Sequence, residues 1–154
     1  MNELNFIQET QDHIKKVGYY LSLLIKQLVS RANTHDMSKI GNEKEHDIFK
    51  EFTPKLKSST YGSTEYAEFL KEMKKALDSH YAGNNHHPEH YINGICGMSL
   101  IDLMEMICDW KAATLRHNDG NLIRSIEQNQ KRWGYSDEIK QILLNTIVFF
   151  EDTI

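Results

Sequence analysis

The scarcity of proline and the absence of strand-like alternation constrain the fold of this chain more than any other feature. Only Pro54 and Pro88 occur among the 154 residues. Proline interrupts helices because it lacks a backbone N–H, and apolar residues at every second position are typical of half-buried strands. Since neither signal is common here, the sequence predicts an all-α protein. No repeat or linker is evident, so we expect a single domain over residues 1–154.

Apolar residues recur at helical spacing in six segments, which cover about residues 4–29, 34–52, 64–81, 99–117, 121–133 and 136–151. We therefore expect a bundle of about six helices, with the second helix ending before Pro54. Ser99 and Asp102 have the spacing of a capping box at the start of the fourth. That fourth helix is apolar on nearly all sides, which predicts a central position in the bundle.

Charge and cysteine usage exclude several classes of protein. The formal net charge is -4, so the chain lacks the basic excess of a general nucleic-acid binder. The net charge does not exclude a local basic pocket. No apolar run approaches membrane-spanning length, and the N-terminus lacks the pattern of a signal peptide. Cys96 and Cys108 form no disulfide framework. We expect a cytoplasmic protein without a membrane partner, and homo-oligomerisation stays open.

Histidines occur at positions that ordinary surface residues do not explain. His13 shares a helix face with apolar residues, and His80 follows Leu77 on the apolar face of its helix, so both are expected to point inward. Three more histidines lie in the irregular segment 82–98. Asp109 lies on the helix expected to be central, where a carboxylate is costly unless it is paired or bound to a metal. One metal ion would account for all of these positions together.

Each of these features also has an ordinary interpretation. A single histidine on an apolar face can be a hydrogen-bonded core residue, and the pair His35-Asp36 means little alone. Asp109 and its acidic neighbours can form the solvent-exposed polar face of an amphipathic helix. The histidines of segment 82–98 can belong to a polar loop. The metal interpretation is favoured because ligand-type residues recur at four separate points of one short chain.

The same four points resemble the HD superfamily of metal-dependent phosphohydrolases. The order is His13, then His35-Asp36, then a histidine group, then Asp109, and the segment HDMSK looks like the superfamily's signature. Together with SHYAGNNHHPEHY and SLIDLMEMICDWKAATLRH, it is similar to small uncharacterised HD-like proteins of phages and bacteria. The resemblance covers about residues 11–145 and implies an HD-like bundle, located in the host cytoplasm if the source is a phage.

The resemblance also implies a set of ligands. A first ion would be held by His13, His35, Asp36 and Asp109, and Asp36 could bridge to a second ion. The second ion would take two histidines from the middle of the chain, and we favour His80 and His87, with His86 as the near alternative and His90 outside the ligand shell. Because His86 and His87 are adjacent, they are not expected to face the same ion from a regular backbone. The GYP element of the cyclic-dinucleotide branch is absent.

Histidine nitrogens with carboxylate oxygens suit one or two ions of Mn, Fe, Co, Ni or Zn better than Ca or Mg. Such ions activate water for attack at phosphorus. Lys39 and Arg116 are the expected phosphate-binding cations, and Glu89 is the expected general base or an orienting residue. The alternatives are a solvated Lys39, and an Arg116 paired with Asp119 or Glu105.

The sequence therefore predicts a metal-dependent phosphohydrolase that acts on a nucleotide or another small phosphate ester, with Asp36, Lys39, Glu89 and Arg116 in the catalytic site. The alternatives are a di-iron oxygenase, because the HD fold also supports that chemistry, and a non-catalytic module. In such a module the metal would only join helices, or the protein would bind a nucleotide or a protein partner. Fold alone does not decide between these functions. The base, sugar and phosphate linkage stay open.

Overall fold

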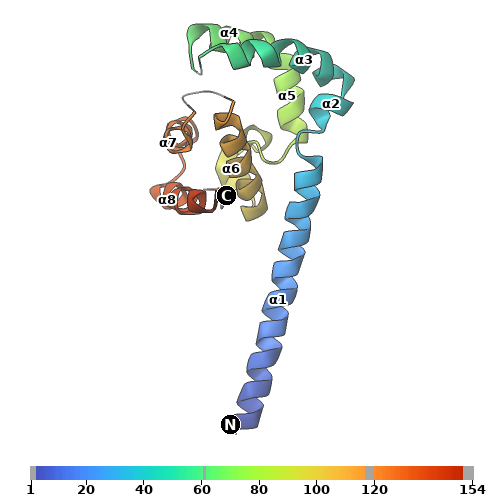
Figure 1. Ribbon diagram of the computed structural model, residues 1–154, viewed down its shortest axis with the longest axis vertical. Coiled ribbons are helices and arrows are strands. Elements are labelled where there is room, and N and C mark those ends of the chain that lie inside the picture. Colours follow the sequence, from blue (N-terminus) through green and yellow to red (C-terminus); the bar gives the residue numbers. More distant parts are fainter. Residues whose placement is uncertain (1–2, 61, 117–119, 151–154) are drawn as a thin grey trace. The chain divides into compact units, whose positions relative to one another are not determined.

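The computed structural model of the chain describes residues 3–60, 62–116 and 120–150. Every regular element in these ranges is helical, which confirms the all-α prediction. The chain divides into two compact units, residues 1–35 and 36–154, and each is described here by itself. Figure 1 labels the helices α1 to α8. Helices close all their hydrogen bonds within one segment, so a chain without strand pairing can still satisfy its backbone.

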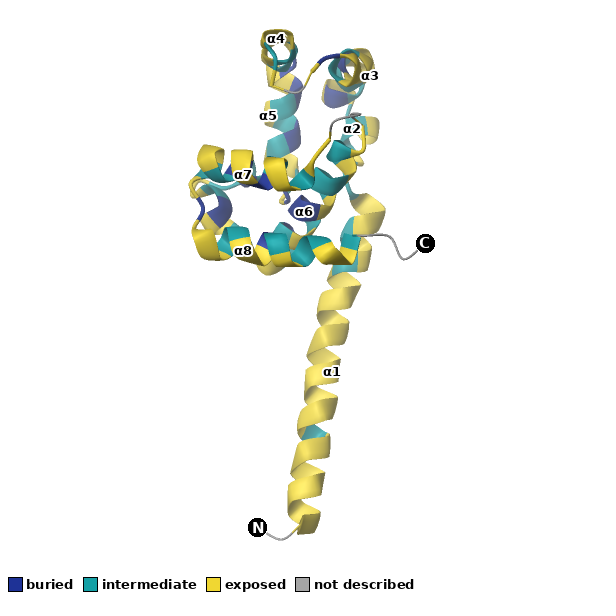
Figure 2. Cartoon of the chain, turned by 60° about the vertical axis from the view of Figure 1, so that its left-hand side comes forward, coloured by how far each residue is buried: buried dark blue, intermediate teal, exposed yellow. Residues whose placement is uncertain are grey.

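The first unit is one long helix, α1 (Glu3–Thr34), of 32 residues. It continues past the expected end at about residue 29, since no proline or glycine follows there to stop it. None of its described residues is buried, as the yellow colour of Figure 2 shows. A single helix has no core of its own, so His13 is exposed and the expected inward orientation is not met within this unit.

The second unit begins with the short turn α2 (Ser38–Gly41) and the helix α3 (Glu43–Ser58). Asn42 caps α3 by accepting a hydrogen bond from the Lys44 backbone N–H at 3.0 Å. The prediction that the helix ends before Pro54 is wrong, since Pro54 lies inside α3. Proline removes one helical hydrogen bond there, and the flanking turns carry the helix past it.

The segment expected as one helix over 64–81 forms two, α4 (Thr64–Glu72) and α5 (Lys74–Gly83). They meet at Met73, whose ψ of -3° departs from regular helix geometry and whose side chain is fully buried. After α5 the expected irregular segment contains two short 3-10 turns, η1 (Pro88–His90) and η2 (Gly94–Gly97).

The remaining helices are α6 (Leu100–Thr114), α7 (Leu122–Trp133) and α8 (Asp137–Thr146), followed by the 3-10 turn η3 (Ile147–Phe150). The capping box predicted for Ser99 and Asp102 is present at the start of α6. Gly134 ends α7 with a φ of 63°, a left-handed conformation that glycine adopts without a Cβ penalty. The single-turn α2 and the division at Met73 explain why about six expected helices become eight.

One apolar cluster of the second unit, hereafter the apolar core, contains six buried residues, namely Ile95, Met106, Ile107, Ile126, Tyr135 and Leu143. Two of them belong to α6, and Met106 is fully buried, in agreement with a central position for that helix. Tyr135 donates its hydroxyl to the Ile126 carbonyl at 2.5 Å. Within the described residues, no helix combines the length and apolarity that crossing a membrane requires.

Candidate metal centre

The site begins at Asp36, the first residue of the second unit, which lies in a tight turn ahead of α2. Its φ is 56°, and among the described residues it is the one non-glycine with a positive φ. Aspartate tolerates this left-handed conformation better than most residues, because its short polar side chain forms local hydrogen bonds. Here the Lys39 Nζ donates to Asp36 Oδ2 at 2.5 Å, and the Lys39 backbone N–H donates to the Asp36 carbonyl at 2.9 Å.

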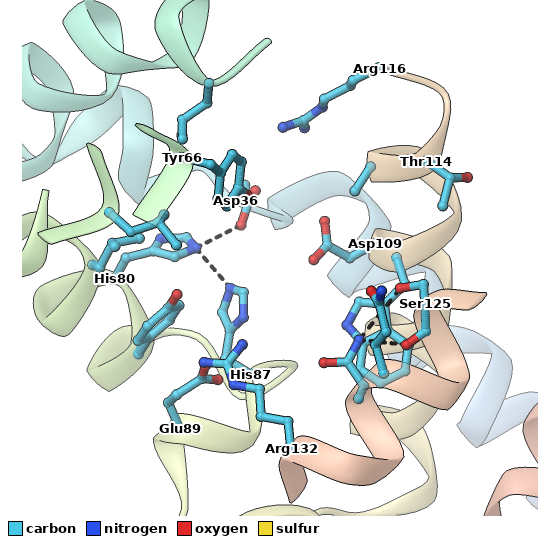
Figure 3. A pocket seen from close by; sticks show the side chains of 18 of the residues that line it. Asp36, Tyr66, His80, His87, Glu89, Asp109, Thr114, Arg116, Ser125 and Arg132 are labelled. Carbon is cyan, nitrogen blue, oxygen red and sulfur yellow. Dashed lines mark hydrogen bonds and ion pairs between the residues drawn. The ribbon is translucent and has the colours of Figure 1, made fainter. Parts of the chain in front are cut away.

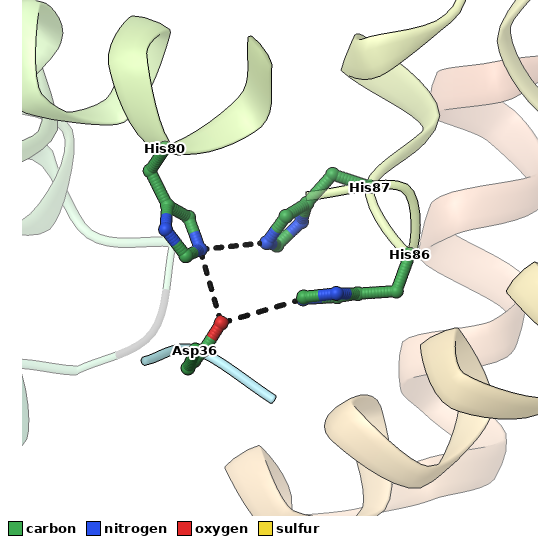
Figure 4. A group of neighbouring side chains, drawn as sticks. All are labelled: Asp36, His80, His86 and His87. Carbon is green, nitrogen blue, oxygen red and sulfur yellow. Dashed lines mark hydrogen bonds and ion pairs between the residues drawn. The ribbon is translucent and has the colours of Figure 1, made fainter. Parts of the chain in front are cut away.

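Three histidines converge on Asp36 from the end of α5 and the turn that follows it (Figure 4). The Nε2 atoms of His80 and His86 lie 3.1 Å and 3.5 Å from Asp36 Oδ1. The Nε2 atom of His87 lies 3.0 Å from that of His80. Asp36, His80, His86 and His87, hereafter the histidine cluster, each offer one ligand atom within 4.8 Å of all the others.

These separations match the spacing of ligands around one metal ion. Bonds from zinc to nitrogen or oxygen are about 2.0–2.2 Å long. Two such bonds at octahedral or tetrahedral angles place their ligand atoms roughly 3.0–3.5 Å apart. The separations in the histidine cluster are 3.0, 3.1 and 3.5 Å. The donor set therefore fits one divalent ion of the borderline type.

The adjacent residues His86 and His87 both turn toward the cluster, which differs from the expectation that only one of them could. That expectation assumed a regular backbone, but the chain forms a turn between α5 and η1. Their ring centroids lie 4.0 Å apart with an interplanar angle of 44°. His90, expected outside the ligand shell, donates from Nδ1 to the Tyr81 carbonyl at 3.1 Å.

The electrostatics of the cluster favour the protonation states that metal ligands need. Burial alone raises the pKa of the Asp36 carboxyl, but hydrogen bonds to His80 and His86 and the ammonium of Lys39 hold that pKa well below its usual range. Burial, together with the neighbouring His86 and His80 rings, lowers the pKa of His87 to about 3. At neutral pH Asp36 is therefore an anion and His87 is neutral, as ligation requires.

Two acidic residues behind the histidines, one buried and one half-buried, had no role in the ligand set predicted from the sequence. Glu45 is 1% exposed and lies against His80, and Glu105, considered earlier only as a partner for Arg116, lies against His86. The spacing Asn42-x-x-Glu45 is a capping-box signal that marks Glu45 as a helix-start residue. It contains nothing to indicate contact with His80, which comes from a different helix.

A pocket of about 520 Å³ opens beside the histidine cluster and is lined by residues of the second unit (Figure 3). This volume lies within the roughly 300–1,000 Å³ typical of small-molecule sites. Its wall contains five cationic side chains against three carboxylates; the cations are Lys39, Lys57, Arg116, Arg124 and Arg132, and the anions are Asp36, Glu89 and Asp109. The pocket therefore suits an anionic ligand.

The predicted ligand Asp109 and the remaining predicted catalytic residues all line this pocket. Asp109 offers a carboxylate oxygen within 4.8 Å of one from Asp36. Lys39 forms an ion pair with Asp36, and Glu89 forms one with Arg132 at 2.8 Å. Arg116 was expected within the helix over about residues 99–117, but α6 ends at Thr114, so Arg116 enters the pocket from the following turn.

Two residues of the predicted ligand set belong to the first unit, and a proposed partner of Arg116 lies outside the described residues. His13 and His35 fall within residues 1–35, so their ligand roles stay predictions. Asp119, the alternative partner considered for Arg116, falls in the segment 117–119 that the structure does not describe.

A match over residues 2–149 shows that the chain belongs to the family DUF5662, a family of unknown function. No curated protein and no solved structure matches the chain.

Proposed function

We propose that this member of the DUF5662 family is a metal-dependent phosphohydrolase that acts on a nucleotide or another small phosphate ester. The observation that carries the proposal is the spacing of the histidine cluster. One carboxylate and three imidazoles meet with separations of 3.0–3.5 Å at the edge of a pocket with an excess of cations. A bound divalent ion would lower the pKa of a water molecule enough to supply hydroxide near neutral pH.

The cations of the pocket support a phosphate-bearing substrate. Arginine binds phosphate through two parallel hydrogen bonds, and both Arg116 and Arg132 line the pocket. Arg132 is already paired with Glu89, which leaves its guanidinium oriented at the pocket wall. Arg116 is exposed at the pocket and is the better candidate to hold a phosphate oxygen. Trp110 and Trp133 also line the pocket, and their rings offer apolar surface to the rest of the substrate.

Individual residues receive specific roles in this proposal. Asp36, His80, His86 and His87 would hold the ion, and Asp109 would hold a second ion or orient the attacking water. Lys39 keeps Asp36 ionised and in place through the 2.5 Å contact with Oδ2. Glu89 is the predicted general base, and its ion pair with Arg132 would orient its carboxylate. His13 and His35 stay predicted ligands.

The proposal is tested by metal content and phosphate release measured on one preparation. The protein is purified without chelator, and bound metals are counted by elemental analysis. Phosphate release is then followed for a panel of nucleotides and simple phosphate esters with Mn²⁺ or Co²⁺. We expect bound metal and phosphate release that chelation abolishes. The Asp47→Asn variant is the matched control for Asp36→Asn, because Asp47 is an exposed aspartate that does not line the pocket beside the histidine cluster.

Other results would support the competing functions. Consumption of oxygen with Fe²⁺, without phosphate release, would favour the di-iron oxygenase. Bound metal without either reaction would favour a non-catalytic module. Absence of bound metal after incubation with each candidate ion would contradict the metal centre itself.

A further inference from the structure

A carboxylate lies behind each of the two most deeply buried histidines of the cluster; that of Glu45 is buried and that of Glu105 is half-buried. Glu45 Oε2 lies 3.2 Å from His80 Nδ1, and Glu105 Oε1 lies 3.1 Å from His86 Nδ1. In both rings the carboxylate is at Nδ1, whereas Nε2 points to Asp36. The same arrangement occurs twice, on helices α3 and α6, although the two acidic residues are far apart in the sequence.

The hydrogen bonds around Glu45 determine which atom of His80 carries a proton. Ser38 Oγ donates to Glu45 Oε2 at 2.7 Å, so its only hydrogen is used and it can only accept from His80 Nδ1, 2.9 Å away. Glu45 as a carboxylate also only accepts. Both oxygens nearest to His80 Nδ1 are therefore acceptors, and Nδ1 must be the donor.

The other polar neighbours fit this assignment without conflict. Glu45 Oε1 accepts from Asn42 Nδ2 at 3.0 Å and from Ser79 Oγ at 3.0 Å, so both oxygens of the buried carboxylate are satisfied. Asn84 Nδ2 also lies 3.1 Å from His80 Nδ1, but its two hydrogens are used by the His80 carbonyl at 2.7 Å and by Ser38 Oγ at 3.1 Å. Among the described residues, no neighbour of His80 Nδ1 is left to donate a hydrogen bond to it.

We infer that Glu45 and Glu105 are positioning residues that keep a proton on Nδ1 of His80 and His86 and thereby direct the Nε2 lone pairs to the metal. The inference rests on the proposed metal centre for its purpose, but the proton positions follow from the contacts in the protein alone. A carboxylate on the outer nitrogen of a ligating histidine fixes the ring orientation and raises its basicity. It would strengthen binding of Zn²⁺ or Co²⁺ more than binding of Mg²⁺, which prefers oxygen ligands.

The first test needs no variant and no metal. The ¹⁵N signals of the histidine rings are measured by NMR in the metal-free full-length protein. We expect a protonated Nδ1 in both His80 and His86. An unprotonated Nδ1 in His80 would overturn the inference, whether or not the protein binds metal. A protonated Nδ1 in a protein that never binds metal would instead contradict the proposed function alone.

The second test compares Glu45→Gln, Glu45→Asp and Glu105→Gln with the control Glu51→Gln. Glu51 is an exposed residue of α3 that pairs with Lys55. We expect each glutamine variant at 45 or 105 to bind Co²⁺ about 10- to 100-fold more weakly and to change the ring ¹⁵N shifts of its histidine. Glu45→Asp should recover part of the affinity, and Glu51→Gln should match the unaltered protein.

These readouts separate positioning from a purely structural role. Loss of thermal stability in Glu45→Gln with unchanged Co²⁺ affinity and unchanged ring shifts would overturn the role of Glu45. If Glu45→Gln does not fold, Glu105→Gln decides the question, because Glu105 is less deeply buried and lies outside the Ser38 network. Unchanged Co²⁺ affinity in that variant would also overturn the inference.

Discussion

The apolar core and the two innermost histidines of the histidine cluster lie in the same unit and are buried to the same depth, but their chemistry is opposite. Met106 and Ile107 are 0% and 2% exposed in the apolar core, while His80 and His86 are 1% and 2% exposed in the cluster. Burying an apolar side chain stabilises the fold, whereas burying a polar or charged one costs free energy unless partners compensate. The core therefore supplies stability, and the cluster costs stability wherever its polar contacts do not compensate for burial.

The contrast extends to how the two regions are assembled. The apolar core is built mostly from successive elements, α6 to α8, so many of its contacts are close in sequence. The cluster joins Asp36 to the end of α5 and relies on hydrogen bonds of fixed direction. Substitutions in the core should alter stability and spare metal binding. Substitutions in the cluster should do the reverse.

The largest expected effect comes from Asp36→Asn, which keeps the size and the tolerance for a positive φ but removes the charge. We expect loss of most bound metal and a fall in phosphohydrolase activity of roughly 1000-fold or more, the scale seen when a directly participating group is removed. The far-ultraviolet circular dichroism spectrum should stay helical. Wild-type metal content in this variant would remove Asp36 from the site.

Next in size is Met106→Ala in the apolar core. Removal of a fully buried methionine should lower the free energy of unfolding by about 2–5 kcal/mol, because it leaves a cavity that the helices fill only in part. Chemical denaturation of the metal-free protein measures this change. Met104→Ala, on the same helix but 38% exposed, is the control and should cost far less. Equal costs for both variants would contradict the position of the core.

The double variant His80→Ala with His87→Ala sharpens the comparison between the two regions. It should reduce the metal stoichiometry by about one ion, because it removes two of the four residues that offer ligand atoms to that ion. His46→Ala is the control, since His46 is exposed on α3. Unchanged stoichiometry would limit the histidines to a structural or substrate-binding role.

A smaller effect is expected for Arg116→Lys, which keeps the charge but loses the planar fork of the guanidinium. Activity on phosphate esters should fall by an amount equivalent to about 1–3 kcal/mol, the scale of a charge-assisted hydrogen bond, with metal content unchanged. Activity and melting temperature are measured on the same preparation. A destabilised variant with full activity per folded molecule would instead indicate that Arg116 pairs within the protein.

The smallest effect concerns Tyr135, whose hydroxyl donates to the Ile126 carbonyl within the apolar core. Burial raises the pKa of Tyr135 to about 12, above its value of about 10 in an unfolded chain. Its contribution to stability is therefore complete below pH 10 and is lost as the pH rises through about 12. Tyr135→Phe should cost about 1 kcal/mol at pH 8 and reduce the loss of stability between pH 10 and 12. An unchanged pH profile would contradict this assignment.

The fold could be predicted from the sequence wherever a local sequence rule determines the secondary structure. The capping box of Ser99 and Asp102 predicts the start of α6, and the apolar residues around Met106 predict that this helix is central. The continuation of α3 past Pro54 and the break between α4 and α5 at Met73 could not be predicted from the sequence. At both positions, tertiary contacts override the local helix propensity. Periodicity alone does not contain that information.

Part of the candidate site could also be predicted, because local sequence rules place some of its residues. His80 could be placed inward from its register with Leu77, and Asp36 stands out by its position next to His35. The meeting of Glu45 with His80 could not be foreseen, since the two residues are 35 positions apart and come together only when α3 packs against α5. Nor could the joint orientation of His86 and His87, which depends on the exact path of a turn.

The distance along the chain between Asp36 and His80 has a consequence for the lifetime of the protein. The two residues are 44 positions apart, so an ion that binds both would close a long loop, as a reversible cross-link does. Cross-linking a loop of that length reduces the entropy of the unfolded chain by an amount worth on the order of 4 kcal/mol. Opening of the segment between them, and with it cleavage by proteases, would then slow as free metal rises.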